Sequence, residues 1–195
     1  MKIGLFFGSF NPIHVGHLII ANHILNETNL KKLWFVISPQ SPFKQSPTLL
    51  NEYDRLHLVR KAIEGDTRLK ASEIEFSLPK PSYTSHTLAY LKEKYPLYEF
   101  VIVMGSDSFQ NLGNWKNTDA IIKNHSIIIY KRPGFEIINE LNASVQIMDA
   151  PLLEISATYI RDLLKKGKSI TYLVPQTIED EILSLGFFKK SKHNS

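Results

Sequence analysis

Short hydrophobic runs alternate along this chain with longer segments in which hydrophobic residues recur at helical spacing. The runs predict β-strands at residues 3–7, 33–38, 100–104 and 126–130, and a weaker one at 145–148. The helically spaced segments predict helices at about 15–27, 52–64, 82–94, 106–112, 119–123, 157–166 and 176–185. Strands that alternate with helices are typical of βαβ units, so the expected fold is α/β, with a doubly wound and mostly parallel sheet.

The length and composition of the chain indicate one domain. It has 195 residues, of which 43% are hydrophobic, and this is enough to bury one sizeable core. We therefore expect a single domain over residues 1–188. The last residues, 189–195, include Lys189, Lys190, Lys192 and His193, and this basic tail is expected to be disordered.

The charge of the chain favours anionic partners. The formal net charge is +4 at pH 7, and the sequence pI is about 9.1. Binding to nucleic acid would call for a basic stripe interleaved with aromatic residues or for a recognisable module, and the sequence has neither. We therefore expect phosphorylated small molecules as partners, and no nucleic acid.

The chain is expected to work in the cytoplasm, without contact to a membrane. No stretch approaches the roughly 18 apolar residues of a membrane span. The first residues lack the apolar region and the small-residue cleavage site of a signal peptide. The chain has no cysteine, which excludes disulfides and thiolate catalysis and fits a reducing compartment.

Candidate chemistry gathers where the predicted strands end. Polar loops follow them at residues 8–17, 38–44, 105–115 and 155–161. In a doubly wound sheet, ligands bind outside the carboxyl ends of the strands, near the point where the strand order reverses. We therefore expect one ligand site at this edge of the sheet, built by these loops.

The loop at 8–17, GSFNPIHVGH, leads from a strand through a tight turn into the start of a helix. Free N–H groups and the positive end of the helix dipole make a helix start an anion site, and His14 and His17 add two donors there. A His pair alone is more often structural, but the glycines and the Asn-Pro turn favour phosphate binding. Zinc is disfavoured, because the chain lacks cysteine and the His-Glu-x-x-His pattern.

Residues 156–161 begin another predicted helix and offer Ser156, Thr158 and Arg161. Taken alone, Ser156 is best explained as the N-cap of that helix. The alternative is a second phosphate clamp, since a guanidinium donates two parallel hydrogen bonds to an oxyanion. Beside the first motif, the clamp is the preferred interpretation.

Three further segments each carry a structural and a functional interpretation. Lys44 is either a solvated loop residue or a phosphate contact. The hydroxyl groups at 82–87 either cap the helix that follows or contact a ligand. Trp115 could fill the rim of the core, but its neighbours are polar, and an exposed indole beside a cleft is a stacking surface for a flat ring.

The string at 8–17 resembles the Gly-x-Phe-x-Pro-x-His-x-Gly-His signature of the nucleotidyltransferase superfamily, relatives of class I aminoacyl-tRNA synthetases, and residues 155–161, ISATYIR, are similar to that family's second signature. The resemblance implies a Rossmann-like nucleotidyltransferase fold, in which the first motif holds the ATP phosphates and the second grips the β and γ phosphates. It assigns catalysis to His14, His17 and Arg161, and ATP binding to Gly8, Ser9, Phe10, Ser156 and Thr158. Asn11 stands where Asp is frequent, which leaves the role of its side chain open.

Further motifs occur in the order found in bacterial nicotinate-nucleotide adenylyltransferases, and this resemblance spans residues 3 to about 186. They are SYTSHTL at 82–88, GSDS at 105–108, Trp115, RPG at 132–134 and YLVP at 172–175. The resemblance implies that Tyr83 and Thr84 contact the pyridine carboxylate and that Trp115 stacks on the ring. It places Gly105 and Asp107 on the adenosine side and Lys44 near the phosphates. Arg132 is left out of the site, because an Arg at a strand end is often a solvated rim residue.

The activity implied is transfer of AMP from ATP to nicotinate mononucleotide, which yields nicotinate adenine dinucleotide and pyrophosphate on the way to NAD. A phosphate oxygen of the mononucleotide is the nucleophile, so no protein nucleophile is needed. Mg²⁺ is expected as a cofactor bound through the ATP phosphates and water, with no metal ligand from the protein. The alternatives left open are an enzyme that prefers nicotinamide mononucleotide or another phosphorylated acceptor, and a catalytically silent nucleotide sensor. A homo-oligomer is also left open.

Overall fold

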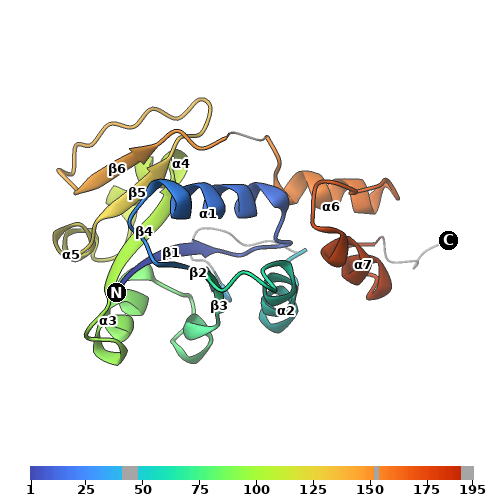
Figure 1. Ribbon diagram of the computed structural model, residues 1–195, viewed down its shortest axis with the longest axis horizontal. Helices are drawn as coiled ribbons and strands as arrows, with labels where there is room; N and C mark the ends of the chain where they lie inside the picture. Colours follow the sequence, from blue (N-terminus) through green and yellow to red (C-terminus); the bar gives the residue numbers. More distant parts are fainter. Residues whose placement is uncertain (41–47, 152–153, 190–195) are drawn as a thin grey trace.

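Six parallel strands form one sheet in the part of the chain that the computed structural model describes, residues 1–40, 48–151 and 154–189 (Figure 1). The strands are β1 (Lys2–Gly8), β2 (Lys32–Ile37), β3 (Leu69–Ser72), β4 (Glu99–Gly105), β5 (Ile127–Tyr130) and β6 (Val145–Met148). Their order is β3-β2-β1-β4-β5-β6, and each neighbouring pair is parallel. The order reverses between β1 and β4, the place where a doubly wound sheet binds its ligands.

Helices cover both faces of this sheet. They are α1 (Val15–Glu27), α2 (Glu52–Ala62), α3 (Thr84–Lys94), α4 (Ser106–Gln110), α5 (Thr118–Asn124), α6 (Ala157–Lys165) and α7 (Gln176–Ser184), with the 3₁₀ turns η1 (Ile74–Ser77) and η2 (Leu112–Asn114). The apolar residues of α1, α2, α6 and α7 belong to one core cluster, and those of α3, α4 and α5 belong to a second. Figure 1 shows α6 and α7 together at one end of the molecule.

The central strands are hydrophobic throughout because they are covered on both faces. In β1, Ile3 and Leu5 point into the cluster with α3, while Phe6 points into the cluster with α1. The β2 strand has only its first residue exposed, and β4 is likewise buried after its first residue. The short apolar runs in the sequence are therefore the signature of a sheet buried between two helical layers.

The predicted α/β fold is confirmed, and the sheet is parallel throughout its described strands. The prediction missed β3 and η1. The sequence of β3, LKAS, contains no hydrophobic run, because this short edge strand buries only its last two residues. The helix predicted from residue 82 begins at Thr84, because Tyr83 has extended backbone angles and acts as its N-cap residue. The segment predicted as one helix at 106–112 is divided between α4 and η2.

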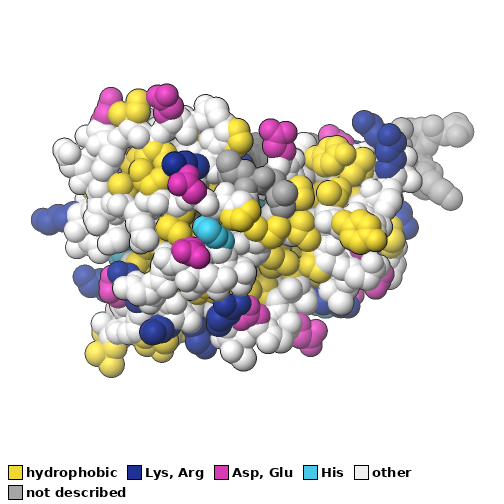
Figure 2. Space-filling model, turned by 45° about the horizontal axis from the view of Figure 1, so that its top comes forward, with side chains coloured by type: hydrophobic (Ala, Val, Ile, Leu, Met, Phe, Trp, Pro, Cys, Tyr) yellow, Lys and Arg dark blue, Asp and Glu magenta, His cyan; other side chains and the backbone are white. Residues whose placement is uncertain are grey.

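On the face that Figure 2 shows, hydrophobic side chains are exposed at the end formed by α6 and α7, and also across the middle and at the opposite end. The large hydrophobic residues exposed at the α6 and α7 end are Tyr159, Tyr172, Leu183 and Leu185. Of the expected basic tail only Lys189 is described, and its ammonium donates to the carbonyl of Leu183 at 3.2 Å. Within the described residues, no helix is long and apolar enough to cross a membrane.

Candidate active site

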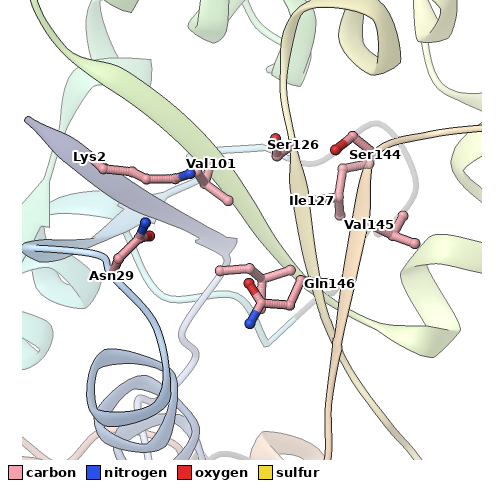
Figure 3. A pocket seen from close by; sticks show the side chains of 9 residues that line it. Lys2, Asn29, Val101, Ser126, Ile127, Ser144, Val145 and Gln146 are labelled. Atoms are coloured by element: carbon pink, nitrogen blue, oxygen red, sulfur yellow. The ribbon is translucent and has the colours of Figure 1, made fainter.

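Two cavities open at opposite ends of the strands. The smaller one, about 140 Å³, lies at the amino ends of β1, β5 and β6, where Figure 3 shows the Lys2 side chain extended toward Val101. The larger one, about 700 Å³, lies at the carboxyl ends of β1 and β4 and is called the cleft. The cleft is at the edge where the sequence predicts a ligand site.

The cleft collects most of the predicted site residues from distant parts of the chain. Those that line it are Gly8, Ser9, Phe10, His17, Tyr83, Thr84, Gly105, Asp107, Trp115, Ser156, Thr158 and Arg161. His14 is buried, and its ring stacks against that of His17. Lys44 lies outside the described residues.

The two histidines form a stacked pair at the start of α1. His14 is the N-cap residue, His17 lies in the first turn, and their ring centroids are 3.7 Å apart with 26° between the planes. The backbone N–H of His14 donates to Nδ1 of His17 at 3.3 Å, which places the proton of a neutral His17 ring on Nε2. A Cβ on Gly16 would lie 3.1 Å from Nδ1 of His14, so a glycine leaves room for this ring.

Burial keeps both rings neutral at pH 7. It lowers the pKa of His14 to about 4, and the nearby charge of Arg132 acts in the same direction. The pKa of His17 is held well below its ordinary value, first by burial and then by His14 and Arg132. The Nε2–H of His17 is therefore a neutral donor on the wall of the cleft, suited to a phosphate oxygen.

Gly8 and Phe10 shape the turn that precedes the histidines. Phe10 has a positive φ of 45° and a buried ring, and a Cβ on Gly8 would come within 2.9 Å of that ring. The Phe10 ring also meets the His17 ring edge-on, with 5.1 Å between centroids. The side chain of Phe10 thus backs His17, and the ATP-binding role assigned to it stays a prediction.

Arg161 joins the two signature motifs. Its guanidinium donates to the backbone carbonyl of Asn11 at 2.8 Å and to the hydroxyl of Thr158 at 3.1 Å. The Ser156 hydroxyl accepts the N–H of Tyr159 at 3.1 Å, so the expected N-cap is present at the start of α6. The starts of α1 and α6 therefore form one wall of the cleft. Phosphate contacts by Ser156 and Thr158 stay a prediction.

The structure assigns a role to the buried side chain of Asn11. Its amide nitrogen donates to the carbonyl of Thr48 at 3.0 Å, and its amide oxygen accepts the N–H of Leu50 at 3.1 Å. An ionised carboxylate could accept from Leu50 but could not donate to Thr48. At this position, Asn therefore connects the first motif to the segment that leads into α2.

Arg55 supports the cleft without lining it, and sequence reasoning missed it. It lies in α2, is fully buried, and donates to the backbone carbonyls of four residues: Ser9, Ser38, Pro39 and Leu50. These carbonyls belong to the ends of β1 and β2 and to the start of α2. Arg55 precedes the buried residues Leu58 and Val59 by three and four positions, so its place on the apolar face of α2 was the available signal.

Arg132 was also left out of the predicted site. As expected for a strand end it lies on the rim, with its side chain 44% exposed, but it also lines the cleft. Its Nε lies 3.5 Å from Oδ1 of Asp107, and its backbone N–H donates to the hydroxyl of Ser106 at 2.9 Å. A Cβ on Gly105 would collide with the Asp107 carboxylate, so the glycine makes room for this pair.

Another part of the cleft, called its aromatic end, is lined by Tyr83, Thr84, Trp115 and Lys116. Trp115 is partly buried against the core cluster of α3 and α5 while it also lines the cleft, so the structural and the functional interpretation both retain support. The Lys116 ammonium lies 4.6 Å from the centroid of the Tyr83 ring. This end therefore combines flat aromatic surface with a positive charge.

Glu75 lies beneath this end and was also missed. It comes from η1, is 1% exposed, and accepts the hydroxyl proton of Thr87 at 2.8 Å. Burial raises its pKa above the ordinary value, against the opposing effect of hydrogen bonds such as that from Thr87. Its other oxygen, Oε2, has no hydrogen-bond partner among the described residues. No sequence signal marked this glutamate, because η1 itself was not predicted.

Known proteins match this chain over nearly its whole length. Residues 5–163 match the cytidylyltransferase-like family. The chain is 51% identical over 190 residues to a probable nicotinate-nucleotide adenylyltransferase of Cytophaga hutchinsonii, which covers 96% of this chain and 98% of the relative. It is 47% identical over 193 residues to one of Flavobacterium psychrophilum, covering 97% and 100%.

A similar solved structure is that of Plasmodium falciparum nicotinic acid mononucleotide adenylyltransferase complexed with NaAD. The TM-score is 0.82 at 22% identity, over 96% of this chain and 97% of that chain. At this identity the likeness supports the fold. The assignment of individual residues rests on the geometry of the cleft.

Proposed function

The chain belongs to the cytidylyltransferase-like family, with nicotinate-nucleotide adenylyltransferases as its relatives, and we propose on this ground that it transfers AMP from ATP to nicotinate mononucleotide. The products are nicotinate adenine dinucleotide and pyrophosphate, and the reaction is a step of NAD biosynthesis. We place it in the cytoplasm as part of the same proposal. Whether the chain forms a homo-oligomer stays a prediction.

The observation that best supports this function is the link between the two motifs. Arg161 of α6 binds the backbone of Asn11 in the turn before α1, and His17 with its neutral Nε2–H lines the same cleft. Two helix starts, a guanidinium and an imidazole donor are thus directed to one region of the cleft. Such a set of donors suits a triphosphate better than any single helix start would.

The reaction needs little covalent help from the protein. In the proposed mechanism a phosphate oxygen of the mononucleotide attacks the α-phosphorus of ATP as the bond to pyrophosphate breaks. The nucleophile is already ionised near neutral pH, so neither a protein nucleophile nor a strong base is required. Catalysis then rests on alignment and on neutralising the charge that builds up on the phosphates, which we assign to His17, Arg161 and the start of α1.

Mg²⁺ enters this proposal as part of the ATP substrate. Within the described residues, no group of three His, Cys, Asp or Glu side chains gathers as metal ligands. An Mg²⁺ ion held by the triphosphate oxygens and water would need no such group. The ion supplies positive charge to the departing pyrophosphate, and the protein residues orient the two substrates.

The positions of the two substrate ends follow the motif resemblance and stay part of the proposal. The adenosine is placed beside Gly105 and Asp107, and the pyridine ring beside Trp115 with its carboxylate near Tyr83 and Thr84. Trp115 is partly buried and lines the cleft, which makes its indole a candidate for stacking, and Thr84 is the first residue of α3, where N–H groups have no acceptor within the helix.

Pyrophosphate release in the presence of Mg²⁺ and ATP tests the function. It should be compared for nicotinate mononucleotide, nicotinamide mononucleotide and phosphopantetheine. We expect turnover with nicotinate mononucleotide at the highest kcat/KM. Equal or better efficiency with the amide would reject the substrate assignment, and no pyrophosphate with any acceptor would favour the nucleotide sensor.

A further inference from the structure

The aromatic end of the cleft contains a lysine to which neither signature motif assigns a role. Lys116 follows Trp115 directly and lines the cleft with Tyr83 and Thr84. Its Nζ lies over the face of the Tyr83 ring, 4.6 Å from the centroid. A cation on the loop after η2 is thereby held above Tyr83, the N-cap residue of α3.

The charge of Lys116 has no acidic partner in the described part of the chain. None of the ion pairs found there includes it. The two carboxyl groups that line the cleft form no ion pair with Lys116: Asp107 lies 3.5 Å from Arg132, and Glu75 is buried and bonded through one oxygen to Thr87. The ammonium is therefore free to pair with an anionic group of a ligand.

The start of α3 supplies further donors at the same place. The N–H groups of His86 and Thr87 both donate to the carbonyl of Tyr83, at 3.0 and 3.2 Å. Helix geometry then leaves the N–H groups of Thr84 and Ser85 for an acceptor from outside the helix. The positive end of the helix dipole lies there too, so an anion at this point meets donors from α3 and the ammonium of Lys116.

We propose that Lys116 determines the preference for the acid substrate, by pairing its ammonium with the carboxylate of nicotinate mononucleotide bound at the start of α3. A carboxamide at the same point carries no charge, and its NH₂ group would face the donors of α3 and Lys116. The difference between the two substrates is confined to this group, since both carry the same ribose and phosphate. This inference rests on the proposed function.

The test is the kcat/KM for nicotinate and nicotinamide mononucleotides in Lys116→Gln, Lys116→Arg and the wild-type chain. For Lys116→Gln we expect about a tenfold loss with the acid, the scale of one charge-assisted hydrogen bond in a partly enclosed site, and less than a twofold change with the amide. Lys116→Arg keeps the charge and should retain most of the preference. Lys123→Gln, an exposed lysine of α5 outside the cleft, is the matched control and should change neither value.

An equal loss with both mononucleotides would show that Lys116 contacts their shared phosphate or holds the loop, and would overturn the proposal, as would an unchanged preference in Lys116→Gln. Lys116→Glu should reverse the preference toward the amide, and Tm measured alongside should stay within a degree or two of wild type, because Lys116 is exposed. If the wild-type chain turned over no mononucleotide at all, the proposed function would fail before this inference is reached.

Discussion

At the scale of single residues, His17 combines placement in the cleft with a proton state set by its neighbours. Its Nδ1 accepts from the backbone of His14, and burial keeps the ring neutral, so Nε2–H is the group offered to substrate. A donor held in this way costs no reorganisation when charge develops on a phosphate.

His17→Ala should therefore lower kcat by on the order of 10²-fold or more, the scale measured when one transition-state donor is removed. The KM for ATP should change much less than kcat, since a contact made mainly in the transition state shows itself in turnover. Steady-state kinetics with varied ATP give both values. A tenfold rise in KM at unchanged kcat would show that His17 serves ground-state binding instead.

Glu75→Gln tests the buried carboxyl under the start of α3. Burial raises the pKa of Glu75, so the folded chain favours the protonated form, and the stability this carboxyl provides is lost as pH rises from its unfolded pKa of 4.5 through the raised folded value. Gln can still accept from Thr87 and does not ionise. We expect a Tm a few degrees above wild type at pH 8, since each kcal/mol is worth about 2–4 °C in a domain of this size. Near pH 4 the two proteins should have the same Tm. A Tm that falls equally at both pH values would mean that Glu75 serves packing alone.

At the scale of elements, Arg55 connects three segments whose mutual placement defines the cleft. Its donors reach the carbonyls that follow β1 and β2 and the carbonyl of Leu50 before α2. The guanidinium is fully buried and the Pro39 carbonyl is buried with it, so losing these hydrogen bonds costs more than losing exposed ones would.

Arg55→Lys should destabilise the chain by about 2–4 kcal/mol, because an ammonium keeps the charge but cannot reproduce the planar set of donors. The loops at 8–9 and 38–39 should also move, which lowers kcat. Urea unfolding and kcat measure the two effects, with Arg60→Lys, an exposed arginine of the same helix, as control. Unchanged stability in Arg55→Lys would contradict this role for the guanidinium.

The elements that sequence reasoning identified and those that it missed differ in how they are buried. β1, β2 and β4 are covered on both faces and therefore appear as continuous apolar runs. β3 lies at the edge of the sheet and η1 is a single turn, so neither carries a hydrophobic period. Glu75 was missed together with η1, and Arg55 was missed although its helix was predicted.

At the scale of the whole molecule, the buried histidine pair links folding to pH. The folded chain holds the pKa of His14 near 4 and that of His17 well below 6.5, so an unfolded chain binds more protons below pH 6.5. The stability that these groups contribute is present above pH 6.5 and is lost as the pH falls toward about 4. This pH dependence is opposite to that of Glu75, whose contribution is lost as the pH rises.

The double variant His14→Gln/His17→Gln should accordingly lose less stability than wild type between pH 7 and pH 5. Urea unfolding at several pH values gives the free energy of unfolding of each protein. Subtracting one value from the other removes the contribution of the carboxyl groups, because both proteins share it. Parallel curves for the two proteins over this range would contradict the lowered pKa of the two histidines.

The sequence by itself determined the features that depend on neighbours along the chain. Apolar runs and helical spacing determined the α/β class, and the polar loops after the strands located the site at the carboxyl edge of the sheet. Motif spacing placed His14 and His17 at the start of α1 and Ser156 at the N-cap of α6, because caps and turns are set by a few consecutive residues.

Tertiary structure alone decided which distant groups meet. The sequence did not determine the role of the Asn11 side chain. Its hydrogen-bond partners are Thr48 and Leu50, which lie 37 and 39 residues away along the chain. Arg161 reaches Asn11 across 150 residues, and Arg132 affects the pKa of His14 from the end of β5. Hydrogen bonds and charges act over a few ångströms in space, so their partners are known only once the sheet order has brought the loops together.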